Sequence, residues 1–206
     1  MEVDHLVYAA RDLATAVDEL ATRMGVRATP GGRHVGLGTH NALLALGPHM
    51  YLEIIAPDPT QPAPAQPRPF GLDTLPTARL VTWALKAPDI DTHVVEARRA
   101  AYDPGVVMSM SRTQPDGTRL AWRLTLTPRL QGDGIVPFLI DWGRTPHPAA
   151  GAPSGCVLMD LRAEHPEPQV VRPLLKAVKA DLRLSSGAAP ALIATLETPR
   201  GCLQLR

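Results

Sequence analysis

The alternation of hydrophobic and polar residues at the start of the chain predicts a strand followed by a helix. Residues 3–10 alternate and carry Val, Leu, Val and Tyr, which is typical of a half-buried strand. After Asp12, which can act as an N-cap, apolar residues recur three or four positions apart, with charged residues between them. Gly25 follows the last of them, and a glycine there commonly ends a helix in the left-handed conformation.

Two apolar runs later in the same segment predict a hairpin and complete a first unit. Residues 26–29 favour a short strand, and the glycine pair at 31–32 favours a turn directly after it. Residues 39–46 and 50–56 are expected to be two strands that a Gly-Pro turn joins. The order strand, helix, strand, strand, strand therefore accounts for residues 1–57.

A proline-rich connector over residues 58–77 precedes a second unit with the same order, residues 78–143. Proline fixes φ and removes a backbone donor, so the connector is expected to be semi-extended and outside any sheet centre. Asp89 lies 77 residues after Asp12 and in the same place within its unit, which indicates two similar units rather than a solenoid. The strands expected in this unit are 78–87, 106–112, 119–126 and 135–142. A turn is expected at residues 115–117, between the strands 106–112 and 119–126.

The C-terminal segment, residues 155–206, predicts a partial third unit of the βαββ kind. A strand is expected over residues 156–162 and a helix over residues 166–178. Pro173 lies within that helical pattern, so the helix must start late or kink there. A final hairpin follows, which leaves this unit one strand short of the other two.

Composition places the chain among ordinary globular proteins. Of its 206 residues 45% are hydrophobic and 20% charged, and a formal net charge of +1 provides no field that attracts nucleic acid or an anionic membrane. The 4% of aromatic residues are too few for base-stacking platforms, and no apolar run is long enough to cross a membrane. The N-terminus shows no basic leader and no apolar signal core, so we expect a cytoplasmic protein without nucleic-acid or membrane partners.

Two polar residues stand alone in apolar strands and are the strongest candidates for a site. Glu53 lies between Leu52 and Ile54, and His5 lies in an equally apolar run. Because burying an unpaired carboxylate is costly, both side chains are expected to face one cavity. There Glu53 could act as a base next to a carbonyl, with His5 as the second catalytic residue.

Further candidates for ligand binding follow from the same alternation. Thr39 and Asn41 share a face of their strand, where they could orient the oxygens of a ligand beside Glu53. Alternatively, both could hold the preceding turn through side-chain bonds to the backbone. His34 could line the mouth of the cavity. Trp142, at the end of its strand, could form a wall of the pocket, although core packing is the usual role of a tryptophan.

The repeated order of elements and several short motifs resemble the vicinal oxygen chelate superfamily and, more narrowly, its glyoxalase-like domain family. The resemblance implies an α+β fold in which tandem βαβββ units form a cup. With the partial third βαββ unit they would make one globular glyoxalase-like domain. The motifs that carry the resemblance are Asp4-His5-Leu6-Val7-Tyr8 with Asp12-Leu13, Gly31-Gly32-Arg33-His34 with Gly38-Thr39-His40-Asn41, Tyr51-Leu52-Glu53-Ile54-Ile55, and Pro137-Phe138-Leu139-Ile140-Asp141-Trp142.

The superfamily also implies a divalent metal in the cup, held by the first and last strands of each unit. His5 and Glu53 match the first pair of ligands, and an imidazole with a carboxylate suits Zn, Fe, Mn or Ni. The positions that match the second pair are Thr82 and one near Leu139, with Asp141 two residues further along the same strand face. Because Thr82 and Leu139 are poor ligands, no tightly bound metal is expected.

Two functions remain open from the sequence. The cup could bind a small-molecule ligand without any cofactor, which the missing second ligand pair favours. The alternative is a metal-dependent lyase, isomerase or dioxygenase of the superfamily, in which His5 and Glu53 bind the metal or Glu53 acts as the base. Cups of this superfamily are often completed by a neighbouring copy, so the resemblance also implies a homodimer.

Overall fold

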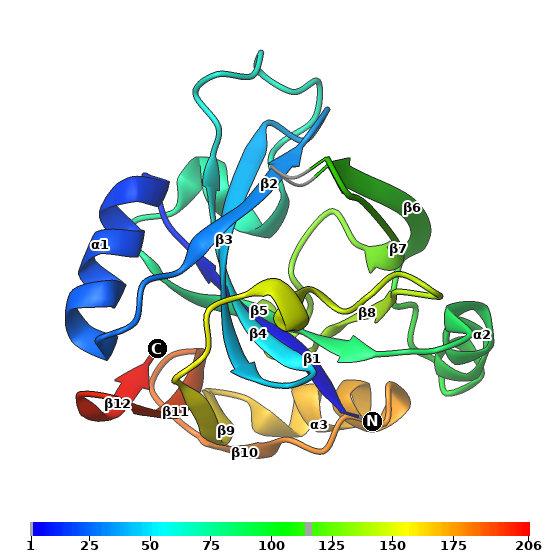
Figure 1. Ribbon diagram of the computed structural model, residues 1–206. Coiled ribbons are helices and arrows are strands. Elements are labelled where there is room, and N and C mark those ends of the chain that lie inside the picture. The colour runs from blue at the N-terminus through cyan, green and yellow to red at the C-terminus, as the bar shows by residue number, and fades with distance from the viewer. Residues whose placement is uncertain (1, 114–116) are drawn as a thin grey trace.

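The computed structural model describes residues 2–113 and 117–206. Within these ranges the chain forms an eight-stranded sheet and a four-stranded sheet, with helices packed against them (Figure 1). The large sheet curls into an open half-barrel, which confirms the predicted α+β fold with a cup. Its strands and the two helices of its units are, in chain order, β1 (Val3–Ala9), α1 (Leu13–Met24), β2 (Thr29–His34), β3 (Thr39–Gly47), β4 (Met50–Pro57), β5 (Arg79–Lys86), α2 (Ile90–Arg99), β6 (Val106–Thr113), β7 (Arg119–Leu126) and β8 (Phe138–Asp141).

Two units with the same strand pairing build the large sheet. Its strand order is β2-β3-β4-β1-β5-β8-β7-β6, so each unit contributes four neighbouring strands. β1 pairs in parallel with β4, β5 pairs in parallel with β8, and β1 and β5 pair antiparallel at the junction. Asp12 and Asp89 each precede the helix of their unit, as predicted, and Gly25 ends α1 in the left-handed conformation. Residues of the edge strands β2 and β6 also lie in contact with each other.

The glycine pair at residues 31–32 lies inside β2 and does not form the turn that the sequence predicts. The turn follows at residues 35–38 instead. Gly31 is required for space, because a Cβ at this position would lie 2.4 Å from side-chain atoms of both Asn41 and Arg112. A local sequence signal for a turn is thus explained by a close approach of side chains from two other strands.

The second unit also departs from its expected boundaries. β8 begins at Phe138 and not at residue 135, because a 3-10 turn, η2 (Gln131–Gly134), carries the chain into the strand. The turn predicted at residues 115–117 lies partly outside the described residues. In the connector, the structure adds a short 3-10 segment, η1 (Pro69–Thr74), that the proline-rich composition did not indicate.

The C-terminal segment has one strand more than predicted, and its pairing differs from that of the first two units. β10 is missed because Leu184 is its only buried residue, too little for an alternation to be recognised. It pairs in parallel with β9, to which α3 connects it. The elements of this segment are β9 (Val157–His165), α3 (Pro168–Ala177), β10 (Arg183–Ser186), β11 (Ala191–Thr198) and β12 (Gly201–Leu205).

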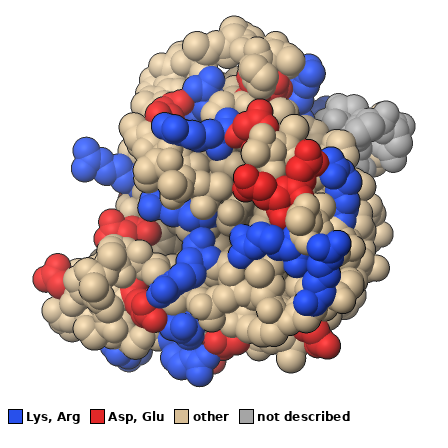
Figure 2. Space-filling view, turned by 90° about the vertical axis from the view of Figure 1, so that its left-hand side faces the viewer, with Lys and Arg blue, Asp and Glu red and all other residues tan. Residues whose placement is uncertain are grey.

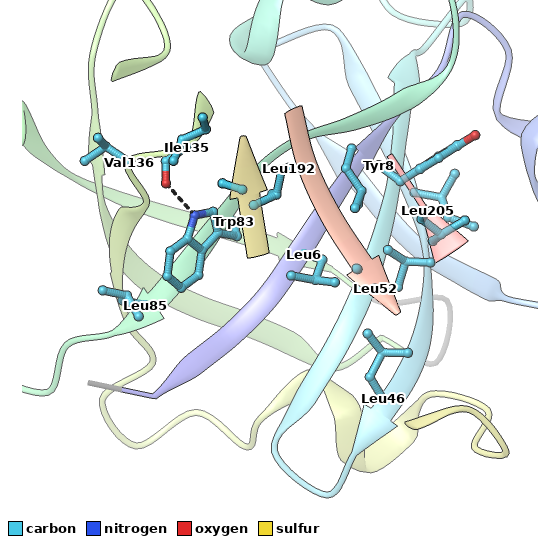
Figure 3. Close-up of a cluster of buried hydrophobic side chains, with 14 of the residues drawn as sticks. Leu6, Tyr8, Leu46, Leu52, Trp83, Leu85, Ile135, Val136, Leu192 and Leu205 are labelled. Atoms are coloured by element: carbon cyan, nitrogen blue, oxygen red, sulfur yellow. Dashed lines mark hydrogen bonds between the residues drawn. The ribbon is translucent and has the colours of Figure 1, made fainter. Parts of the chain in front are cut away.

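Successive side chains of the central strands point to opposite faces of the large sheet. One set packs into a core behind the sheet, and the other faces the cup in front of it. Leu6 and Tyr8 of β1 belong to the core, together with residues of the helices and of the C-terminal sheet such as Leu192 (Figure 3). Trp83 is 1% exposed in this core, and its indole N–H donates to the carbonyl of Ile135 at 2.8 Å. The C-terminal sheet therefore supports the back of the cup and does not line it.

The surface gives a similar picture to the composition. No helix in the described ranges has both the length and the apolar character that crossing a membrane requires. On the face drawn in Figure 2, positive and negative side chains are interspersed over the surface. This mixture agrees with the formal net charge of +1.

Candidate functional site

A pocket that is partly open to solvent occupies the concave face of the large sheet, and its empty space is about 530 Å³ when the part open to solvent is included. Both units and the connector contribute to its lining, so the cup inferred from the sequence is hollow. Its apolar and aromatic lining consists of Leu37, Ile55, Pro69, Phe70, Met110, Trp122, Leu124, Leu126, Phe138, Ile140 and Trp142. Its polar lining consists of His5, His34, Asn41, Tyr51, Glu53 and Arg112.

His5 and Glu53 meet in this cavity, as the isolated polar positions in two apolar strands suggested. His5 Nε2 lies 3.8 Å from Glu53 Oε2, and both side chains are buried. The parallel register of β1 and β4 places His5 opposite Tyr51, and the period of two brings Glu53 to the same face. The rings of His5 and Tyr51 stack with their centroids 4.5 Å apart, which fixes the plane of the imidazole.

Asp4 sets the orientation of His5. Its buried carboxylate accepts hydrogen bonds from His5 Nδ1 at 2.8 Å and from Trp142 Nε1 and His147 Nε2, each at 3.2 Å. Burial raises the pKa of Asp4, but the bonds and charges of His147 and His5 together hold it well below its usual range. Because Nδ1 donates to this carboxylate, His5 presents Nε2 to the cavity and to Glu53.

A chain of hydrogen bonds crosses the cup from one unit to the other. Asn41 Nδ2 donates to Glu53 Oε1 at 2.5 Å, and Asn41 Oδ1 accepts from Arg112 Nη1 at 2.8 Å. Asn41 and Glu53 belong to the first unit, whereas Arg112 comes from β6 of the second. Burial lowers the pKa of this guanidinium, and Tyr51 and Glu53 oppose that shift. A carboxylate and a guanidinium thus face the same cavity, joined by one amide.

His34 and Thr39 flank this chain of hydrogen bonds. His34 Nε2 lies 4.0 Å from Glu53 Oε1, and His34 Nδ1 lies 3.0 Å from Thr39 Oγ1. Burial lowers the pKa of His34, and the Glu53 carboxylate opposes that shift. Thr39 is fully buried and is not one of the described residues that line the cavity, so it contacts the site through His34. Of the two positions, Asn41 faces the ligand space.

Four aromatic rings belong to the apolar wall of the cup: Phe70, Trp122, Phe138 and Trp142. Trp142 lines the cavity, which was one of the two roles considered for it from the sequence. The centroids of the Trp142 and Trp122 rings lie 5.3 Å apart. Phe70, from the connector, stacks on Phe138 at 5.7 Å. Its φ of 61° is uncommon for a bulky residue, and such backbone strain often marks functional sites. The connector is therefore part of the cup wall and more than a spacer.

Neither Arg112 nor Asp4 was among the site residues predicted from the sequence. A charged residue near the end of an edge strand normally faces solvent, and the partner of Arg112, Asn41, lies 71 positions away. The one available signal was that Arg112 continues the alternate positions of Met108 and Met110. For Asp4 the signal was its place directly before His5, since a carboxylate commonly orients a functional imidazole.

The register of the second unit corrects one of the expected metal positions. Val7 pairs with Glu53 in the first unit, and Ala84 pairs with Phe138 in the second. Because Ala84 follows Val7 by the repeat offset of 77 residues, Phe138 corresponds to Glu53 and Leu139 does not. Leu139 belongs to the core behind the sheet. The counterpart of the Glu53 carboxylate is thus an aromatic ring.

The second unit does not supply the pair of metal ligands that the resemblance to the superfamily implies. Thr82 offers only a buried hydroxyl, and Asp141 accepts a hydrogen bond from Gly143 N outside the cavity lining. Among residues 2–113 and 117–206, no group of three His, Cys, Asp or Glu side chains is placed to hold a metal ion. Arg112 adds a cation to the same cavity, and its charge opposes that of a second cation.

Replacing Gly31 by alanine should lower the free energy of unfolding by about 1–3 kcal/mol, the usual cost of overpacking. The new Cβ would lie 2.4 Å from Arg112 Nη1 and Asn41 Oδ1 and 2.9 Å from Leu43 Cγ. Urea unfolding measures the loss, and Gly151→Ala is the matched control because a Cβ there meets nothing within 4 Å. Equal stability of the two variants would contradict the close approach.

Comparison with known proteins identifies the family. The chain matches the model of the glyoxalase-like domain family over residues 3–179, and it therefore belongs to that family. This finding confirms the resemblance inferred from the sequence motifs. No curated protein matches the sequence.

One solved structure of similar fold supports the assignment of the fold, and two others are more distant matches. A hypothetical protein from Staphylococcus aureus has a TM-score of 0.66 and 14% sequence identity, covering 98% of this chain and 84% of that chain. Methylmalonyl-CoA epimerase from Mycobacterium tuberculosis has a TM-score of 0.43 and 19% identity, covering 68% of this chain and 87% of its own. Methylmalonyl-CoA epimerase from Streptomyces coelicolor, in complex with 2-nitronate-propionyl-CoA, has a TM-score of 0.43 and 16% sequence identity. The match covers 72% of this chain and 99% of the epimerase chain.

Proposed function

We propose that this protein binds a small, largely apolar organic molecule in its cup and does so without a resident divalent metal. The observation that carries the proposal is the Glu53–Asn41–Arg112 chain of hydrogen bonds at the wall of a cavity lined largely by aromatic and aliphatic side chains. Small-molecule sites typically combine apolar walls with a few fixed polar groups that orient the ligand. Here the rings of Trp122 and Trp142 supply the walls.

The polar groups are fixed before any ligand arrives, which favours binding of a defined molecule. Asn41 is held by two hydrogen bonds, one to Glu53 and one from Arg112, and His5 is held by Asp4 and by stacking on Tyr51. Ordered side chains lose little conformational entropy on binding, so their contacts contribute more of their interaction energy to affinity. One chain supplies the cavity lining described above, so the proposal does not depend on the predicted homodimer.

Proton transfer on the bound molecule is a second candidate function, and the Asp4–His5 pair favours it. A carboxylate that accepts from Nδ1 leaves His5 Nε2 directed at the cavity, 3.8 Å from Glu53 Oε2. An imidazole and a carboxylate in such positions can accept and return a proton beside a substrate carbon or oxygen. Lyase, isomerase or dioxygenase chemistry with a metal on His5 and Glu53 is the third reading, and the donor set argues against it.

Melting curves with and without metal distinguish metal-free ligand binding from metal-dependent chemistry on His5 and Glu53. We expect the wild type to melt at the same temperature in chelator and in added Zn, Mn, Fe or Ni, and Glu53→Gln to behave in the same way. A metal at a free concentration of about a hundred times its dissociation constant would add roughly 2.7 kcal/mol to the free energy of unfolding. A true metal site would therefore raise the melting temperature clearly. A metal-dependent rise in the wild type that Glu53→Gln abolishes would overturn the metal-free proposal.

A further inference from the structure

Arg112 retains an unused hydrogen-bond donor in the cup. Its side chain is 5% exposed, and its Nε has no hydrogen-bond partner among the described residues. Arg112 Nη1 donates to Asn41, so the contact with the protein uses one side of the guanidinium. Buried polar groups are nearly always paired, and a charged one that is not paired is especially costly. Because Arg112 lines the cavity, an unpaired donor on its guanidinium points to an acceptor that a ligand brings.

The charge of Arg112 is also not neutralised by direct contact. No carboxylate of the described residues lies within ion-pair distance of its guanidinium. Glu53 is the acid of the same cavity, but Asn41 stands between the two groups and bonds to both. Arg123, in the neighbouring strand β7, shows the contrast, because it is 41% exposed and forms a two-bond ion pair with Asp91. Arg112 thus has the burial of a site residue without the ion pair of a structural one.

We infer that the ligand of the cup is an organic carboxylate whose anionic oxygen accepts a hydrogen bond from Arg112 Nε. This inference rests on the proposed function and adds the chemical class of the ligand. A carboxylate forms short, charge-assisted bonds with arginine, and it would supply both the missing acceptor and the missing negative charge. The aromatic walls formed by Trp122, Phe138 and Trp142 would surround the apolar remainder of the molecule.

Matched pairs of probes test the inference. Phenylacetate, hydrocinnamate and hexanoate are each compared with their primary amides, which keep the shape but lose the charge. Ligand-observed NMR and calorimetry are carried out on wild type, Arg112→Met and Arg123→Met, with circular dichroism to establish that each variant is folded. We expect the carboxylates to bind the wild type and Arg123→Met roughly ten- to hundredfold more tightly than the amides. In Arg112→Met this preference should disappear while weak binding of the amides persists.

The outcomes separate this inference from the proposal on which it rests. If acids and amides bind the wild type equally well, the cup is a binding site but the assignment of a carboxylate is wrong. If the preference for acids survives in Arg112→Met, another cation recognises them and the inference is equally overturned. If neither class binds the wild type, the proposed function fails as well. Arg112→Lys keeps the charge but not Nε, so a preference reduced in this variant would support a bond to Nε itself.

Discussion

Asp4→Ala should lower the free energy of unfolding by about 3–5 kcal/mol, the range for removing one partner of a buried charged cluster. The carboxylate is fully buried, and its loss leaves donors on His5, Trp142 and His147 without their acceptor. Chemical unfolding followed by circular dichroism measures the effect. Asp91→Ala is the control, because Asp91 is an exposed acid that pairs with Arg123 at the surface, and its loss should be far smaller. Similar losses in the two variants would contradict the structural role given to Asp4.

Ionisation of Asp4 is expected to make the free energy of unfolding depend on pH. Burial raises the pKa of Asp4, and the hydrogen bonds and charges of His147 and His5 lower it further than burial raises it. A lowered pKa in the folded state means that the stabilisation is complete above the unfolded-state pKa of about 4 and is lost as pH falls below it. The difference between wild type and Asp4→Ala should therefore be large at neutral pH and shrink in acid. A difference that stays constant would argue against an ionised, paired Asp4.

Trp83→Ala should cost about 3–5 kcal/mol, as expected for truncation of a fully buried tryptophan. Trp83 lies in the core that joins the back of the cup to the C-terminal sheet, and its indole N–H occupies the carbonyl of Ile135 (Figure 3). Truncation creates a cavity and leaves that carbonyl unpaired. Trp83→Phe should lie between wild type and Trp83→Ala, because it keeps most of the apolar contact and loses only the hydrogen bond. A loss below about 1 kcal/mol for Trp83→Ala, the level of a surface substitution, would show that the two sheets do not share one core.

Much of the fold was predictable because strand and helix periods are local properties of a sequence. The spacing between Asp12 and Asp89 indicated the repeat, and both residues precede helices. The shared face of His5 and Glu53 was predictable for a similar reason, since the strand period of two fixes which side chains point the same way. β10 was not predictable, because one buried leucine in four residues carries no recognisable pattern.

The remainder of the site depends on contacts between residues far apart in the sequence. Gly31 resembled a turn residue, but its lack of a Cβ makes room for Arg112, which reaches it from β6 of the second unit. No pattern within a single strand could show that contact. The register between β5 and β8 likewise decides that Phe138, and not Leu139, faces the cup. Local patterns thus predicted which positions were polar and buried, and tertiary packing determined their partners.

The central claim is that the cup binds a small molecule without a metal, and the indole signals of the three tryptophans test it most directly. Trp122 and Trp142 line the cavity, whereas Trp83 lies in the core behind the sheet. In a nitrogen-15 correlation spectrum of chelator-treated protein, assigned with single Trp→Phe variants, hydrocinnamate is added stepwise. We predict that the indole signals of Trp122 and Trp142 shift together to saturation while that of Trp83 stays in place. Signals of Trp122 and Trp142 that remain unchanged until a divalent metal is supplied would contradict the account.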